Sequence, residues 1–122
     1  MNPDDYCINR NAIIENIVTR VSVRSYDRTR PIEPATVETL LRAAMSAPTA
    51  VNRRPWAFVV VNDPQLLSRL AAALPYAKMA AQAPMAIVVC GDLTRFLAGD
   101  DATLWVQDLS AASENLLLAA HA

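Results

Sequence analysis

Glycine is nearly absent from this sequence, which has only Gly91 and Gly99 among its 122 residues. Phosphate-binding loops of the Walker type and of dinucleotide-binding folds need several closely spaced glycines, because the backbone must approach the phosphates without intervening side chains. The sequence therefore excludes both kinds of loop.

Histidine, cysteine and long apolar runs are also scarce. His121 is the only histidine, and no Cys, Asp or Glu set around it has ligand spacing, so no metal site is expected. Cys7 and Cys90 form no CxxC pair, which predicts reduced thiols in a cytoplasmic protein. No apolar run approaches the ~18 residues that a membrane span needs, so no membrane partner is expected.

A strong charge excess is missing too. The chain has 11 basic and 12 acidic residues, a net charge of -1, and a composition that is 53% hydrophobic. Nucleic-acid-binding domains usually carry a basic excess, so nucleic acid is not an expected partner. The length and composition predict one globular domain over residues 1–122.

Hydrophobic periodicity predicts helices that alternate with two apolar strands, and hence an α+β fold. Pro34 and Pro48 bracket the second helix, and Asp63 with Pro64 is typical of the start of a third helix. The expected elements are helices at 11–19, 34–47, 64–74 and from Asp100 or Asp101 to 122, a short helix at 76–82, and strands at 56–61 and 85–91.

The predicted sheet is incomplete. Both strands are apolar throughout, as in strands buried on both faces, yet a stable sheet usually needs three or more strands. The last helix is apolar around most of its surface and reaches Ala122 without a glycine cap. We therefore expect a domain that lacks a C-terminal part, or one that a partner completes.

The stretch "TRVSVRSYDRTRP", residues 19–31, concentrates arginines in a chain without a basic excess. Read as a helix, it would put Arg20, Arg24 and Arg28 on one stripe, but β-branched residues and a following proline oppose a helix. Read as extended chain, it puts Arg20, Ser22 and Arg24 on one side, with Val21 and Val23 turned toward the core.

Two guanidinium groups that flank a hydroxyl suit a phosphate monoester, because each charge-assisted hydrogen bond contributes ~1.5–3 kcal/mol. A solvated basic loop is the alternative, and the arginine segment alone leaves it open. Arg28 and Arg30 are expected to be surface charges of that kind.

Three segments together resemble the FMN-dependent nitroreductase family. They are "RVSVRSYDRTRPI", then "SAPTAVNRRPWAFVVV" after a helix, then "WVQDLSAASENLLLAAHA". The resemblance extends from about Ile13 to the end of the chain. It implies a nitroreductase-like central sheet flanked by helices, in a homodimer that binds FMN at the subunit interface.

The resemblance also implies roles for individual residues. Arg20 and Ser22 would hold the FMN phosphate, and Arg24 would lie near the pyrimidine edge of the flavin ring. A second segment would reach the flavin of the other subunit; its members are Pro48, Thr49, Ala50 and Asn52. For Asn52, a simple turn role between helix and strand stays open.

The activity that the resemblance implies is an oxidoreductase with NADH or NADPH as reductant. A hydride would pass through the flavin to a nitroaromatic, a quinone or a similar acceptor, so no catalytic side chain is expected. Another reductase on the same flavin scaffold, or a truncated relative that only dimerises without cofactor, are the alternatives. Arg54 departs from the family pattern, which usually has Gln at that position.

Overall fold

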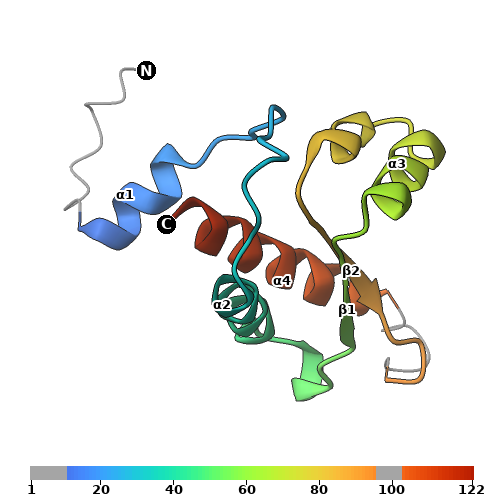
Figure 1. The fold of residues 1–122 in the computed structure, drawn as a ribbon. Helices are drawn as coiled ribbons and strands as arrows, with labels where there is room; N and C mark the ends of the chain where they lie inside the picture. The colour runs from blue at the N-terminus through green and yellow to red at the C-terminus, as the bar shows by residue number, and fades with distance from the viewer. Residues whose placement is uncertain (1–10, 96–102) are drawn as a thin grey trace.

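A computed structural model describes residues 11–95 and 103–122, in which helices lie around a small antiparallel sheet (Figure 1). The elements in chain order are α1 (Ala12–Thr19), α2 (Pro34–Met45), η2 (Ala50–Asn52), β1 (Trp56–Val61), α3 (Pro64–Ala73), η3 (Lys78–Gln82), β2 (Ala86–Gly91) and α4 (Leu104–His121). The predicted α+β class and the incomplete sheet are confirmed.

Side-chain caps explain where two of the helices begin. The Asn11 side chain accepts hydrogen bonds from the backbone amides of Ile13 and Ile14 at the start of α1. Asp63 does the same for the first amides of α3, with Pro64 at the first helical position. These caps satisfy amides that have no partner inside the helix. The start at Asp63 and Pro64 is as predicted, whereas the cap by Asn11 was not predicted.

The sheet consists of β1 and β2, which pair antiparallel from Trp56 opposite Gly91 to Val61 opposite Ala86. Helix α4 packs on α2 and touches both strands, and its C-terminal end lies beside α1 (Figure 1). Helix α3 and η3 pack together beyond the end of β1 at which α3 begins (Figure 1). The long helix α4 is therefore the element that connects the layers.

Alanines form the contact between α2 and α4. Ala44 and Ala112 are fully buried, Ala47 is 6% exposed, and Phe58 of β1 packs against this cluster. Small side chains let two helices approach closely, so that backbone and neighbouring side chains fill the interior.

The prediction that both strands are buried on both faces is wrong for the described residues. Val59 is 51% exposed and Val60 is 39% exposed, whereas Phe58 is half-buried against the α2–α4 cluster. The reason is that the α2–α4 cluster packs against the face with Phe58, whereas Val59, which alternates onto the opposite face, is left about half uncovered by the described residues.

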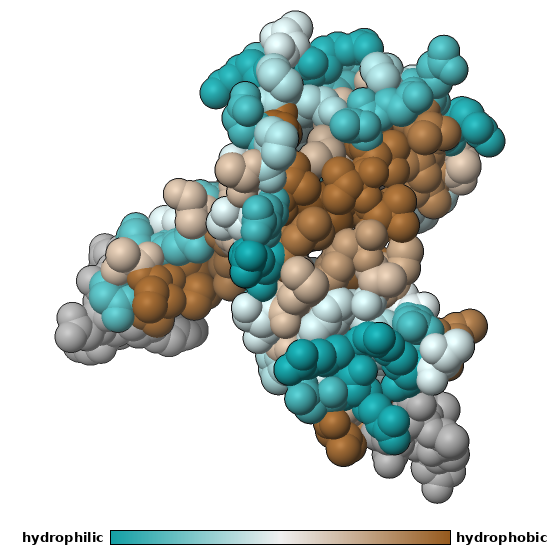
Figure 2. Space-filling view, turned by 60° about the horizontal axis from the view of Figure 1, so that its bottom comes forward, coloured by the Kyte–Doolittle hydropathy of each residue, from teal (hydrophilic) through white to brown (hydrophobic). Residues whose placement is uncertain are grey.

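Large apolar side chains are exposed along much of the described chain. Figure 2 shows them gathered into broad hydrophobic patches on one face. Strongly exposed examples are Ile13, Val21, Val51 and Leu93. Patches of this kind on a folded chain mark surfaces that contact other protein segments or ligands. Among the described helices, none has the length and apolar character to cross a bilayer.

Two further predictions concern the start of the last helix and the conformation of the arginine segment. The last helix begins at Leu104 with Thr103 at its N-cap, and Thr103 makes no side-chain cap. Asp100 and Asp101, the alternatives predicted to open this helix, lie outside the described residues. Residues 20–27 form neither helix nor strand, so the helical interpretation of the arginine segment is wrong.

We predict that Ala112→Leu destabilises the fold by about 1–3 kcal/mol, because the larger side chain cannot fit between α4 and α2 without displacing them. Ala72→Leu is the matched control, since Ala72 is exposed on α3 and should change stability by less than about 0.5 kcal/mol. Urea unfolding of both variants measures the difference. Equal stability of the two would contradict close packing at Ala112.

Candidate functional site

The arginine segment lines a hollow beside the C-terminal end of α4, which we call the cationic hollow. Its volume is about 540 Å³. The segment contributes both guanidinium groups and the hydroxyl that the sequence singled out, and α4 and η3 form the opposite wall. The lining residues used below are Arg20, Ser22, Arg24, Tyr26, Met79, Leu117 and His121.

The polar side chains that line this hollow differ in their exposure and in their interaction partners. The Arg20 side chain is 27% exposed, and its Nε lies 3.9 Å from Glu114 Oε1 on α4. Ser22 and Arg24 are exposed. The Tyr26 hydroxyl donates to the backbone carbonyl of Val23 at 2.9 Å, which fixes the segment's local bend. The arrangement offers several donors to an anion on an otherwise apolar wall.

The prediction that Val21 and Val23 turn toward the core is wrong. Val21 is 67% exposed and Val23 is 60% exposed, and both line the same hollow as the arginines. The segment runs along the surface, so alternation along the chain directs neither set of side chains into the interior.

Arg28 and Arg30 are exposed, as expected for surface charges. They lie in a turn that Asp27 closes, because its Oδ1 accepts hydrogen bonds from the Thr29 hydroxyl and backbone amide. These hydrogen bonds, chiefly the one from the Thr29 hydroxyl, hold the pKa of Asp27 below its usual value. Arg20 and Arg24 therefore line the hollow, whereas Arg28 and Arg30 belong to the turn that follows.

The second predicted segment forms a strained loop between α2 and β1. Val51, Asn52 and Arg54 have φ values of 51°, 54° and 51°, in the left-handed region. Residues other than glycine rarely adopt this region, at a cost of about 1–3 kcal/mol each, and such strain often occurs at functional sites.

Hydrogen bonds hold this loop in place from several directions. The backbone amide of Ala50 donates to Asp108 Oδ1 on α4 at 2.9 Å. The Arg54 amide donates to Thr49 Oγ1 at 3.0 Å, and Arg95 Nη1 donates to the Arg54 carbonyl at 3.2 Å. The surrounding structure therefore imposes the left-handed conformation that the loop residues alone disfavour.

Arg54 also acts on Asn52 directly. Its Nε donates to Asn52 Oδ1 at 3.0 Å, which leaves the amide Nδ2 of Asn52 as the group free to donate outward. Both side chains are exposed. The Arg54 that departs from the family pattern thus sets which group Asn52 presents.

The turn after β2 braces the same loop. Asp92 Oδ1 accepts hydrogen bonds from the Thr94 hydroxyl and amide, and its other oxygen lies 3.5 Å from Arg95 Nε. The Thr94 hydrogen bonds are the main reason that the pKa of Asp92 is lowered, with the Arg95 charge as a smaller cause. The ordered turn holds Arg95 where it reaches the Arg54 carbonyl.

The structure does not bring the two predicted groups together within one chain. Arg20, Ser22 and Arg24 line a hollow with His121 near the C-terminal end of α4, whereas Ala50 is bonded to Asp108 near its start. Along α4 from Asp108, Glu114 beside Arg20 lies about 9 Å away and His121 about 20 Å away, at about 1.5 Å per residue. The two groups therefore contact different parts of the helix.

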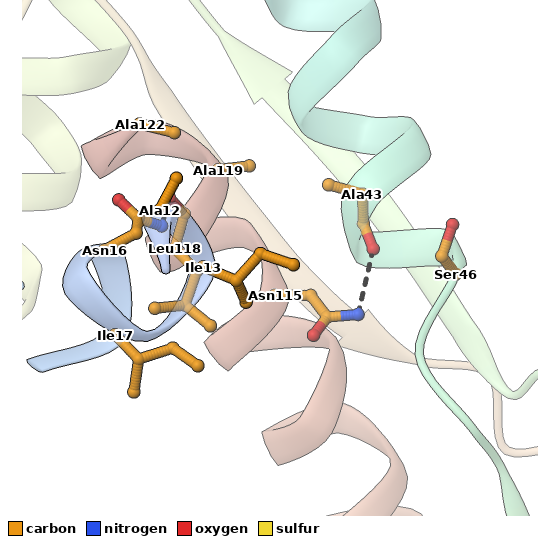
Figure 3. Close-up of a pocket in the computed structure, with 10 residues that line it drawn as sticks. All are labelled: Ala12, Ile13, Asn16, Ile17, Ala43, Ser46, Asn115, Leu118, Ala119 and Ala122. Carbon is orange, nitrogen blue, oxygen red and sulfur yellow. Dashed lines mark hydrogen bonds between the residues drawn. The ribbon is translucent and has the colours of Figure 1, made fainter. Parts of the chain in front are cut away.

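A second hollow of about 610 Å³ lies between α1, α2 and α4 (Figure 3). Ile13 and Ile17 of α1 line it, and Asn115 donates to the Ala43 carbonyl at 3.1 Å. Its lining carries no charged side chain and none of the predicted site residues. It is an apolar groove, unlike the cationic hollow.

Sequence reasoning missed two polar residues that the structure connects to these sites. Asp108 is buried and holds Ala50, and His121 Nε2 lies 3.0 Å from Thr19 Oγ1 beside the cationic hollow. Asp108 was detectable, because Leu104 and Ala112 lie one turn away on either side of it. Within 11–95 and 103–122, no group of three His, Cys, Asp or Glu residues could hold a metal.

Residues 17–75 match the family model described as "Nitroreductase family". Over 115 residues the chain is 40% identical to the "Putative NADH dehydrogenase/NAD(P)H nitroreductase" of Methanothermobacter thermautotrophicus, with 93% of this chain and 58% of that protein covered. By both comparisons the chain is similar to nitroreductase-family proteins. An Archaeoglobus fulgidus relative of the same name is 44% identical, over 88% of this chain and 60% of the relative.

Solved structures of the nitroreductase family have the same fold. A Bacteroides thetaiotaomicron crystal structure, again titled "Putative NADH dehydrogenase/NAD(P)H nitroreductase", is 48% identical, with a TM-score of 0.83 over 92% of this chain and 62% of that one. A Desulfovibrio desulfuricans crystal structure, described as a "putative nitroreductase in complex with fmn", is 30% identical with a TM-score of 0.82. It covers 92% of this chain, which spans 63% of its length. The chain thus spans about three fifths of these relatives.

Proposed function

We propose that the protein to which this chain belongs is an FMN-dependent oxidoreductase, which uses NADH or NADPH as reductant. The observation that carries the proposal is the hollow lined by Arg20, Ser22 and Arg24. The names of the relatives and the FMN complex of the Desulfovibrio structure support the same reading. Bound FMN would supply hydride transfer from the nicotinamide to a nitroaromatic, a quinone or a similar acceptor.

The residues of the cationic hollow fit a flavin phosphate chemically. Arg20 offers a planar set of donors, and Ser22 adds a hydroxyl that can donate to a phosphate oxygen. Glu114 is 55% exposed and 3.9 Å from Arg20, so the ion pair is weak enough for Arg20 to exchange it for an anion. Arg20 and Ser22 would therefore bind the phosphate end of the cofactor.

Arg24 would act further along the same cofactor. An arginine keeps its proton at every pH at which proteins are stable, so Arg24 would direct a permanent positive charge toward the ring. A fixed positive charge beside the pyrimidine edge favours uptake of electrons and raises the reduction potential. Arg24 would thus tune the cofactor, while no side chain needs to act as acid, base or nucleophile.

We further propose that the active form is a homodimer with FMN at the interface. The cationic hollow and the Pro48, Thr49, Ala50 and Asn52 loop contact different parts of α4, which supports this proposal. A second copy related by a two-fold axis would bring the loop of one chain beside the hollow of the other. Asn52 would then donate its amide to the flavin of the other subunit.

The expected result for the activity is a yellow protein whose flavin absorbance bleaches when NADH or NADPH is added without oxygen. A nitroaromatic or a quinone should then restore the absorbance, because the acceptor takes up the electrons. Absorbance spectroscopy of the purified protein makes both measurements. Colourless protein that takes up no added FMN would contradict the proposal.

We predict that Arg20→Ala weakens FMN binding about 10- to 100-fold, because a charge-assisted hydrogen bond to the phosphate is worth ~1.5–3 kcal/mol. Arg28→Ala is the matched control, since Arg28 belongs to the adjacent turn and should weaken binding less than about two-fold. Fluorescence titration with FMN compares the variants. Equal losses of FMN affinity in the two variants would show that the arginines attract FMN only through their general positive charge.

A further inference from the structure

Asp108 is the one buried polar or charged residue among those described, with 7% of its surface exposed. It lies on α4 one turn before the fully buried Ala112, inside the contact between α4 and the rest of the fold. A carboxylate in such a place costs free energy unless a hydrogen-bond partner compensates it. A buried carboxylate at this position is therefore expected to have a hydrogen-bond partner that offsets the cost of its burial.

The partner of Asp108 is the backbone of the strained loop. Asp108 Oδ1 accepts from the Ala50 amide at 2.9 Å, across 58 positions of sequence. The hydroxyls of Ser110 and Ser113, on the same helix, bond only to carbonyls of α4 itself. Of these three α4 side chains, only that of Asp108 makes a hydrogen bond to another element.

The bonded amide lies where the loop needs restraint. Ala50 immediately precedes Val51 and Asn52, whose φ values are 51° and 54°. Thr49 and Arg95 hold the other end of the loop through the Arg54 backbone, at its amide and its carbonyl. Without Asp108, the left-handed residues would have an anchor at one end only, and relaxation toward ordinary backbone angles would displace Asn52.

We propose that Asp108 is a positioning residue of the flavin site, which holds the Ala50 amide so that Thr49, Ala50 and Asn52 keep the conformation that meets the cofactor. This proposal rests on the proposed function, because it assigns the loop to flavin contact. Asp108 itself does not touch the cofactor. It acts through one backbone hydrogen bond from inside the fold.

The test combines hydrogen exchange with FMN titration in purified full-length protein. Asp108→Ala and Asp108→Leu remove the acceptor, and the leucine fills the vacated volume if the alanine variant does not fold. We expect the Ala50 amide to exchange about ten-fold faster or more in these variants, while the Ala112 amide keeps its protection. Asp108→Asn keeps an acceptor oxygen and should restore most of the protection. Ser110→Ala is the control on the exposed side of α4.

FMN affinity should fall about ten-fold in the variants without the acceptor and recover in Asp108→Asn, which a purely structural loss would not do. Unchanged exchange at Ala50 would overturn the proposal. Faster exchange with unchanged FMN affinity would overturn the link between Asp108 and the cofactor. If wild-type protein binds no FMN, the proposed function fails and the flavin role of Asp108 fails with it, whereas the exchange rates still decide whether Asp108 holds the loop.

Discussion

The packing of α4 against α2 is the contact on which the rest of this structure depends. Ala44 and Ala112 are fully buried there, so the two helices approach closely and Phe58 of the sheet closes the cluster. With α4 fixed in this way, its start reaches the strained loop through Asp108, and its end forms a wall of the cationic hollow. One helix therefore sets the positions of both groups of candidate flavin-binding residues, and it also keeps them apart.

Much of the fold could be predicted because it depends on local signals. The caps Asn11 and Asp63, the prolines beside α2 and α3, and the apolar runs of β1 and β2 all act within a few residues. For the arginine segment, β-branched residues and a following proline correctly predicted that it is not a helix. The expected alternation of its side chains failed, because Val21 and Val23 line the same hollow as Arg20 and Arg24. The family resemblance then supplied roles that no local pattern contains.

The wrong predictions of burial concern residues whose exposure depends on packing against distant parts of the chain. Val59 and Val23 are apolar, and their type alone predicts an interior position, yet both are exposed in the described chain. The positive φ values of Val51, Asn52 and Arg54 were equally invisible, because a distant carboxylate and a turn after β2 impose them. Asp108 could have been predicted from the sequence, because an acidic residue between Leu104 and Ala112 on an apolar helix stripe indicates a buried carboxylate.

The central claim is that one FMN contacts the Arg20 group of one copy and the Asn52 group of another. Mixed dimers test it most directly, with Arg20→Ala in one copy and Asn52→Ala in the other, isolated through two different affinity tags. The account predicts that each parent homodimer binds FMN weakly, whereas the mixed dimer binds one FMN per dimer with wild-type affinity, because one of its two sites keeps both intact groups. A mixed dimer with no tight site would contradict the account.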